Sequence, residues 1–449
     1  MDISRRGALK LAGIGGITAI SGCSNVVAPG VRFWSRGATL TPRGGTDRVG
    51  FAESIGSSGD GSTVAVGARR SEPRKVDDPT VAFVFERADG SWSLRTLPAP
   101  DDGDPAGSYC VDISRDGSTV LVGTHGVETM SDRVRGTAYV FERHDGSWSR
   151  TAEVRPENVN RSERFGASVA LAADGRTAVI GAPLEYPGSA YVYERSNGEW
   201  RESAELTAED SHRFGHATAV SSDGATIIVG APYTSTSSRG ITGSATVASK
   251  SGRPEIFEPF CDVGCDRHPG AAYVFEHSGE TWSRTARFVP QPGRSNNLGT
   301  AVALTDDGSL ALVGAPGERV IIHRGGSETL FWGSVYVFER SGGSWTPRPK
   351  LVAGDSVPYR DFGRSIAVSA AGSSAIVGIT TPEGSTDTSP DSASVFAHSE
   401  GVWARQTTLS PAAKSGQPLD HTVALAGDGE TAVLNRHGKN HRGSIAVFE

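Results

Sequence analysis

Two cysteines and a histidine lie close together in one segment, as Cys261-x3-Cys265-x2-His268. Thiolate and imidazole groups are ligands that zinc prefers, and Asp262 or Asp266 could supply a fourth ligand. Three interpretations stay open: a local disulfide between Cys261 and Cys265, two free thiols, or a metal site. The export signal described below favours the disulfide, because disulfides form and persist outside the cytoplasm. We therefore expect neither a metal nor a cofactor in this segment.

Two further segments combine aromatic, imidazole and cationic side chains. One contains His323 and Trp332, and Trp332 stands outside the register of the other tryptophans. The other, residues 436–442, contains Arg436, His437, Lys439, His441 and Arg442. An aromatic side chain on a loop can anchor a partner, and a basic loop can meet an acidic protein or an anionic glycan. The alternatives are that Trp332 folds back on its own loop and that the basic segment is simply solvated.

Linear enzyme signatures are absent from the chain. There is no Gly-x-Ser-x-Gly, no glycine-rich phosphate loop and no His-Glu-x-x-His. A catalytic set gathered from several segments would leave no such motif. Two function classes therefore stay open: a binding module for a protein or glycan, and a hydrolase or lyase that acts on an envelope polysaccharide.

Composition narrows the class of protein. The chain has 449 residues and a formal net charge of −7, which argues against general binding to nucleic acid. Its 57 glycines and 24 prolines are too many for a helical bundle. The apolar residues fall in regular short strips, which excludes a disordered chain. Together these features predict a turn-rich, all-β domain.

The first 22 residues predict an export signal. Arg5 and Arg6 precede a glycine-interrupted apolar run, which is typical of a twin-arginine signal and too short to span a bilayer. Small residues precede Cys23, as in a lipobox, so we expect lipidation of Cys23 and cleavage before it. The alternative is ordinary cleavage beside an incidental cysteine. Residues 23–32 then form a short linker, and the lipid holds the protein at the outer face of a prokaryotic cytoplasmic membrane.

Residues 33–449 consist of repeats. The clearest copy, residues 164–206, has four apolar strips separated by turn residues, which predicts four short strands. An Asp-Gly hairpin turn joins the first two strands. Seven copies of this turn occur, one of them degenerate. They begin at Asp60, Asp116, Asp174, Asp223, Asp307, Ala371 and Asp428.

Tryptophan gives an independent count of the repeats. Seven of the eight tryptophans occupy the fourth strand: Trp34, Trp92, Trp148, Trp200, Trp282, Trp345 and Trp403. We interpret them as packing residues between sheets. Cys110 stands where other repeats have serine, and we interpret it as a small buried thiol.

The two ends of the repeat region complement each other. Trp34 precedes the first complete repeat, whereas the last copy stops at Phe448 and Glu449, in its third strand. We therefore expect residues 33–40 to complete the sheet formed by residues 419–449. The predicted result is a closed ring of seven four-stranded sheets.

The repeat resembles a known family. Phe165-Gly166 in the first strand, followed by Gly181-Ala182-Pro183 after the second, resembles the FG-GAP repeats of integrin α subunits. The Asp-Gly turn and the tryptophan are most similar to those of prokaryotic FG-GAP repeat proteins. The resemblance covers nearly all of residues 33–449 and implies a seven-bladed β-propeller. The Asp-x-Asp-x-Asp-Gly calcium loop of integrin blades is missing, so no calcium site is carried over.

Loop lengths indicate a functional face. In such a ring, the short turns lie on one face, and the variable loops between second and third strands and between blades lie on the other. The longest is the insertion 233–269 in the fourth blade. Because variable loops on a rigid scaffold carry binding sites, we expect this face to bind a protein or glycan without catalysis. Aromatic and arginine side chains there would favour binding, whereas a pocket of Asp, Glu and His at the axis would favour an enzyme.

Overall fold

The computed structural model divides the chain into two units, Met1–Arg32 and Phe33–Glu449. It describes residues from 34 onward except for residues 43–50, 69–79, 99–108, 126–135, 158–163, 184–185, 235–240, 243–268, 280, 291–295, 325–326, 354–360, 381–391, 412–421 and 438–442. The described residues form strands and turns without a helix. Accordingly, no described helix is long and apolar enough to cross a bilayer. The predicted export signal, with Arg5, Arg6 and Cys23, lies outside the described residues.

The strands from β2 to β13 form three four-stranded antiparallel sheets, each with its strands in sequence order. The first contains β2 (Phe51–Ser57), β3 (Thr63–Ala68), β4 (Thr80–Ala88) and β5 (Ser91–Pro98). The second contains β6 (Tyr109–Ile113), β7 (Thr119–Thr124), β8 (Thr137–His144) and β9 (Ser147–Val154). The third contains β10 (Ser168–Leu171), β11 (Thr177–Ala182), β12 (Ser189–Ser196) and β13 (Glu199–Leu206).

The remaining strands repeat this order with small variations. The next sheet contains β14 (Ala217–Val220), β15 (Thr226–Ala231), β17 (Ala271–Ser278) and β18 (Thr281–Val289), with β16 (Ile241–Thr242) parallel to β18 on its edge. An eight-stranded sheet follows, with β19 (Val302–Leu304), β20 (Leu310–Arg324), β21 (Ser327–Ser341), β22 (Ser344–Leu351), β23 (Asp361–Val368), β24 (Ser374–Thr380), β25 (Ser392–Ser399) and β26 (Val402–Leu409). Its two halves are joined where β21 pairs with β23 over two residues.

The last sheet joins the two ends of the described chain. Its order is β1–β29–β28–β27, with β1 (Arg36–Leu40), β27 (Val423–Leu425), β28 (Ala432–His437) and β29 (Gly443–Phe448). Arg36 pairs with Phe448 and Leu40 with Ile445 in an antiparallel register. The predicted pairing of the N-terminal strand with the C-terminal strand is therefore confirmed.

The Asp-Gly turns are closed by their own aspartates. In the turn between β14 and β15, Asp223 Oδ1 accepts hydrogen bonds from Ser221 Oγ at 2.6 Å and from Ala225 N at 2.9 Å. The Ser221 bond lowers the pKa of Asp223 against the opposing effect of desolvation. Asp60, Asp116 and Asp307 make the same two contacts in their own turns. The periodic Asp-Gly pairs thus have a structural role.

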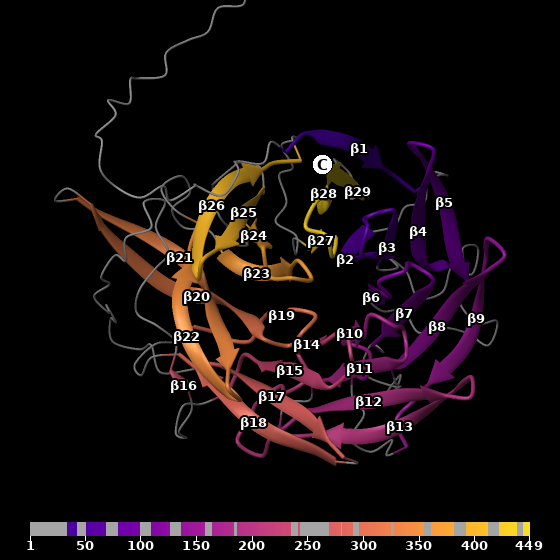
Figure 1. Cartoon of the computed structure of the whole chain (residues 1–449), viewed down its shortest axis with the longest axis horizontal. Coiled ribbons are helices and arrows are strands. Elements are labelled where there is room, and N and C mark those ends of the chain that lie inside the picture. Colours follow the sequence, from indigo (N-terminus) through magenta and orange to yellow (C-terminus); the bar gives the residue numbers. More distant parts are fainter. Residues whose placement is uncertain are drawn as a thin grey trace, which may run out of the picture. The chain divides into compact units, whose positions relative to one another are not determined.

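The first strands of the sheets lie nearest the centre of the unit (Figure 1). In chain order they contact one another from β2 through β6, β10, β14, β19 and β23 to β27, and β27 also contacts β2. Small side chains link them: Ser54 Oγ donates to Val111 O at 3.3 Å, and Cys110 Sγ donates to Ala167 O at 3.0 Å. Cys110 is half-buried, and desolvation raises the pKa of its thiol to about 12, so it stays protonated and unreactive.

The glycines of the Phe-Gly and Gly-Ala-Pro motifs meet where neighbouring sheets touch. A Cβ on Gly181 would lie 2.0 Å from the carbonyl oxygen of Gly215 in the next sheet. Gly215 of the next Phe-Gly motif, at φ +91°, would place a Cβ 2.2 Å from Ser189 O. Only glycine permits both the close approach and the left-handed backbone. The motifs are therefore a device for packing one sheet against the next.

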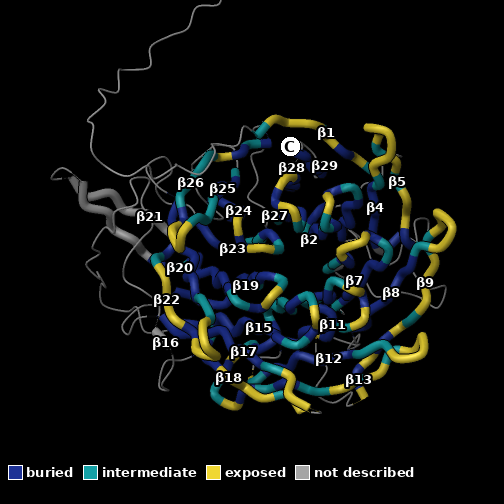
Figure 2. The backbone as a smooth tube through the Cα atoms, in the orientation of Figure 1, coloured by how far each residue is buried: buried dark blue, intermediate teal, exposed yellow. Residues whose placement is uncertain are grey.

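Clusters of buried apolar residues combine side chains from neighbouring sheets. Figure 2 shows that the exposed residues concentrate on the outer strands and their turns. Each tryptophan of the repeat register packs in a different core cluster. Trp345 is 6% exposed and Trp403 is 2% exposed. The interpretation of these tryptophans as packing residues is confirmed.

Charged pairs join the outer parts of neighbouring sheets. Glu86 Oε1 accepts from Arg143 Nη1 at 3.1 Å and from Trp148 Nε1 at 3.0 Å. The same type of ion pair, between an arginine of one sheet and a glutamate of the preceding sheet, recurs between Arg195 and Glu142 and between Arg340 and Glu276. It also occurs between Arg87 of β4 and Glu449, which follows the last strand.

Candidate functional site

A surface patch of aromatic and cationic side chains forms where the β10–β13 sheet meets the β14–β18 sheet. We define the Tyr186 patch as Tyr186, His212, Arg213 and Tyr233. Tyr186 precedes β12, His212 and Arg213 lie between β13 and β14, and Tyr233 follows β15. These are loops between second and third strands and a connection between sheets, the two loop types that the sequence predicts to form the binding face.

The Tyr186 ring is held at two points while much of its surface stays in water. Tyr186 is 62% exposed. Its hydroxyl donates to Glu209 O at 2.7 Å, and its ring centroid lies 5.1 Å from that of His212. An aromatic side chain that is already oriented loses little conformational freedom when it binds a ligand.

Arg213 lies over the second aromatic ring of the patch. Its Cζ atom is 4.5 Å from the centroid of Tyr233, which is a cation–π distance. Among the described residues, no carboxylate forms an ion pair with Arg213 or with the exposed His212. The patch therefore presents a guanidinium group whose charge no described carboxylate balances.

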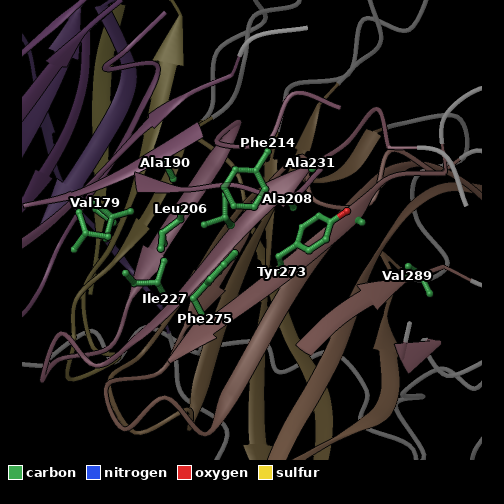
Figure 3. Packing of buried hydrophobic residues seen from close by; sticks show 14 residues of the cluster. Val179, Ala190, Leu206, Ala208, Phe214, Ile227, Ala231, Tyr273, Phe275 and Val289 are labelled. Atoms are coloured by element: carbon green, nitrogen blue, oxygen red, sulfur yellow. The ribbon is translucent and has the colours of Figure 1, made fainter. Parts of the chain in front are cut away.

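The backbone beneath the patch is tied to both sheets. Phe214 N donates to Pro187 O at 3.0 Å, and Gly188 forms a parallel bridge with Phe214. His212 N donates to Thr234 Oγ1 at 3.1 Å. The buried Phe214 ring lies 5.6 Å from the Tyr273 ring and packs beside it and Phe275 (Figure 3). The patch thus stands on a close-packed core that holds its three segments together.

A neighbouring charge cluster leaves the balance around the patch positive. Asp210 Oδ1 lies 3.1 Å from Arg284 Nη1, and Asp210 Oδ2 lies 3.5 Å from Arg287 Nε. Both guanidinium groups also lie over the Tyr273 ring, with the Cζ atoms of Arg284 and Arg287 at 5.7 and 5.6 Å from the ring centroid. Because one carboxylate faces two arginines, Asp210 has little negative charge left to offset Arg213.

A second polar cluster lies inside the β19–β22 region. Glu318 Oε1 accepts from Lys350 Nζ at 2.8 Å and from Tyr336 OH at 3.2 Å, and Glu318 Oε2 accepts from Ser334 Oγ. Glu318 is 0% exposed and Lys350 4% exposed. Asn296 Nδ2 donates to Tyr336 OH at 3.1 Å. A ligand has no access to these buried groups, so we assign this cluster to the stability of the fold.

Asp112 is a third notable carboxylate, and it lies in the innermost strand of its sheet. It accepts from Ile113 N at 2.9 Å and from Leu171 N of the next sheet at 2.8 Å. Desolvation raises its pKa to about 6, although both amides favour the charged form. Among the described residues, no group of three or more His, Cys, Asp and Glu side chains could hold a metal ion.

The structure corrects the expected positions of two predicted groups. Trp332 and His323 lie in strands rather than in a loop: β20 and β21 each run for 15 residues, with Arg319 opposite Trp332 and His323 opposite Glu328. The cause is a pair of apolar strips in this segment, which extend the hairpin because such residues favour strands.

The basic segment and the insertion also contain strand residues. Arg436 and His437 end β28, opposite Ser444 and Gly443, so they do not belong to a loop as expected. In the insertion 233–269, Ile241 and Thr242 form β16. Further predicted residues of these two segments lie outside the described residues: Lys439, His441, Arg442, Cys261, Cys265 and His268.

Comparisons with known proteins agree with this architecture. Residues 148–193 match the FG-GAP repeat family. The chain is similar to Kuenenia stuttgartiensis hydrazine synthase, with 12% identity, a TM-score of 0.51 and coverage of 90% of this chain and 97% of that chain. It is also similar to the β-propeller domain of Myceliophteria thermophila Cps50 (Swd1), with 11% identity, a TM-score of 0.53 and coverage of 91% and 99%. At these identities the likeness concerns the fold alone, and no curated protein sequence matches the chain.

The chain is a β-propeller that carries an FG-GAP repeat. Propellers with this repeat suggest a binding or adhesion-type role. The Tyr186 patch of this propeller was missed by the sequence reasoning, because its members are separated along the chain. The available signals were Tyr186 beside Pro187 and the charged run 209–213 directly before Phe214-Gly215.

Proposed function

We propose that this protein is a non-catalytic binding propeller that recognises a protein or glycan at the cell surface through its variable-loop face. The observation that carries the proposal is the Tyr186 patch. Its exposed aromatic ring is fixed by a hydrogen bond to Glu209 O, and its arginine has no described counter-ion. Both features belong to binding surfaces, where pre-oriented aromatic and arginine side chains contribute most of the affinity.

We further propose a closed ring of seven blades as the scaffold. One pairing within the last sheet and three contacts between the last and first sheets support it. β1 pairs with β29, and Glu449 pairs with Arg87. Asp428 N donates to Gly59 O at 2.9 Å, and Thr422 Oγ1 donates to Glu53 O at 2.5 Å. A closed ring holds its loops in fixed positions, which suits a binding surface assembled from several blades.

The proposal places the propeller outside the cytoplasm, anchored by a lipid on Cys23. Its support is the sequence alone: Arg5 and Arg6 before a short apolar run, then small residues before Cys23. Metabolic labelling with a lipid precursor tests the anchor. We expect label on the wild-type protein and none on Cys23→Ala, with the protein moving from the membrane fraction to the soluble fraction. Equal labelling of both would contradict the proposal.

The binding role is tested by capture of partners from envelope extracts with the full-length protein. We expect Tyr186→Ala to reduce capture while the unfolding temperature stays unchanged, because the ring is mostly exposed. The matched control is Val402→Ala, since Val402 is also an exposed apolar residue, 44% exposed, in another sheet. If Tyr186→Ala and Val402→Ala behave alike, the patch is not the site. If the purified protein hydrolyses or cleaves an envelope polysaccharide, the non-catalytic role is wrong.

A further inference from the structure

We propose that the Tyr186 patch binds the carboxylated sugar residues of an acidic polysaccharide. This rests on the proposed binding function and names the ligand class for the same site. A pyranose ring has an apolar C–H face that packs against an aromatic ring, and a uronate residue adds a carboxylate at its edge. Tyr186 supplies the ring, and Arg213 supplies a guanidinium group suited to a carboxylate.

The surface favours a sugar over a protein partner. A protein interface of standard size needs several aromatic or aliphatic anchors around an apolar centre. Among the described residues, the exposed large hydrophobic side chains are Tyr186, in the loop before β12, and Val402, in β26 of another sheet. One fixed aromatic ring among polar groups matches a ligand that is polar all round and has one apolar face.

The charges favour an acidic sugar over a neutral one. Arg213 and His212 have no carboxylate partner among the described residues, whereas Asp210 is held by Arg284 and Arg287. The protein as a whole carries a net charge of −7, so this positive area contrasts with the average surface. An anionic sugar can therefore form a charge-assisted hydrogen bond with Arg213, which a neutral sugar cannot form.

The geometry indicates how one ligand reaches both groups. Tyr186 lies beside His212 at 5.1 Å between ring centroids, and Arg213 is the next residue along the chain. Tyr233 supports the Arg213 guanidinium from one side at 4.5 Å and thereby limits its freedom. A sugar stacked on Tyr186 can thus place its own carboxylate, or that of the adjoining residue, at Arg213.

Glu209 provides a test of the sign of the charge. Its backbone carbonyl holds the Tyr186 hydroxyl, while its exposed carboxylate makes no ion pair among the described residues. Glu209→Gln keeps the backbone contact and removes one negative charge beside the patch. Binding of an acidic sugar should therefore become tighter, and binding of a neutral sugar should not change.

The experiment measures calorimetric binding of the full-length protein to an oligogalacturonate and to the same oligosaccharide with its carboxylates reduced to alcohols. Loss of the charge-assisted contact predicts at least about tenfold weaker binding of the reduced ligand. Arg213→Asn should lower the affinity for the acidic oligosaccharide to that of the wild-type protein for the reduced oligosaccharide. Asparagine is compatible with the backbone here, because Arg213 has φ +55° and Asn297 has φ +51° at the corresponding place. Tyr186→Ala should weaken the binding of both oligosaccharides, whereas Val402→Ala should change the binding of neither.

Three results would overturn the acidic-sugar assignment. If the two oligosaccharides bind equally well and Arg213→Asn has the wild-type affinity, the patch is a site for neutral sugars. The proposed binding function then remains valid. No binding of either sugar, together with Tyr186-dependent capture of a protein, replaces the glycan by a protein and again leaves the function standing. No sugar binding and no Tyr186-dependent capture would overturn both proposals. Thermal unfolding of each variant confirms that it is folded.

Discussion

Two neighbouring sheets place a buried cation against a buried tyrosine, yet the carboxylate that pairs with the cation is partly exposed in one site and fully buried in the other. In the β14–β18 sheet, Arg287 is the cross-strand partner of Tyr273, and its carboxylate is Asp210. In the β19–β22 region, Lys350 Nζ lies 4.1 Å from the Tyr336 ring centroid, and its carboxylate is Glu318. The side chain of Asp210 is 32% exposed and that of Glu318 is 0% exposed.

The difference lies in which segment supplies the carboxylate. Asp210 comes from the connection that precedes β14, next to His212 and Arg213 at the surface. Glu318 comes from the lengthened strand β20, which is part of the sheet itself. The same arrangement of cation and tyrosine can therefore adjoin a surface or form part of a buried ion pair, depending on whether a loop or a strand supplies the carboxylate.

The largest effect that would sharpen this comparison is expected at Glu318. Glu318→Gln leaves the buried Lys350 ammonium without its carboxylate, which should cost about 3–5 kcal/mol of unfolding free energy. Chemical denaturation measures the loss. A second substitution, Lys350→Met, should recover most of it, because the uncompensated charge is then gone. If Glu318→Gln costs less than 1 kcal/mol, about the value of an exposed pair, the two sites do not differ as described.

Asp112 extends the comparison to a carboxylate held by two amides and, among the described residues, by no cation. Its folded pKa of about 6 lies above the ordinary 3.8, so the folded state retains its proton to higher pH than the unfolded state. Stability should therefore fall by about 2 kcal/mol as pH rises from 4 to 6, and change little from this group above that range. Asp112→Asn should abolish this part of the pH dependence in denaturation curves. An unchanged slope in the variant would assign the dependence to other groups.

A smaller effect is expected at Asp210, because its side chain is 32% exposed and its partner Arg284 is 46% exposed, although its second partner, Arg287, is buried. Asp210→Asn should cost about 1–2 kcal/mol, and the part of that cost due to the exposed Arg284 pair should shrink at high salt. Denaturation of wild type and variant at low and high ionic strength measures both. A loss as large as that at Glu318 would show that the Asp210 site is as closed as the buried one.

The smallest effect on stability is expected at the patch itself. Tyr186→Phe removes the bond to Glu209 O from an exposed ring, so it should change stability by less than about 0.5 kcal/mol. Tyr336→Phe is the matched change in the buried cluster and should cost about 1–3 kcal/mol, because Glu318 and Asn296 lose a partner. Thermal unfolding of the two variants provides the comparison. Equal shifts would contradict the distinction between open and sealed sites.

Much of the fold could be predicted from periodic residues, because each repeat imposes the same local requirements. The strands around Asp223, the tryptophan positions and the pairing of residues 36–40 with the C-terminal strand all follow from spacing along the chain. The Tyr186 patch could not be predicted in this way. Its parts meet only after two sheets have packed, and that contact is made by Gly188 and Phe214, which carry no sign of a ligand.

Trp332 shows a second limit of prediction from the sequence. The sequence predicts a loop for the segment that contains His323 and Trp332, whereas both residues lie in strands. The paired strips that continue β20 and β21 satisfy each other's backbone hydrogen bonds, so the hairpin can lengthen without disturbing the sheet that carries it. Repeat length is therefore a poor guide to where strands end.

The pairing of β1 with β29 also determines when during synthesis the sheet that contains them can be completed. Ser35 and Glu449, which exchange backbone hydrogen bonds beside these strands, are 414 positions apart. The ribosome makes β1 first and its partner last, whereas the sheets in between form from neighbouring hairpins. During synthesis β1 has no partner until residues 443–448 have been made, so its sheet can be completed only after the strands of the other sheets have been synthesised.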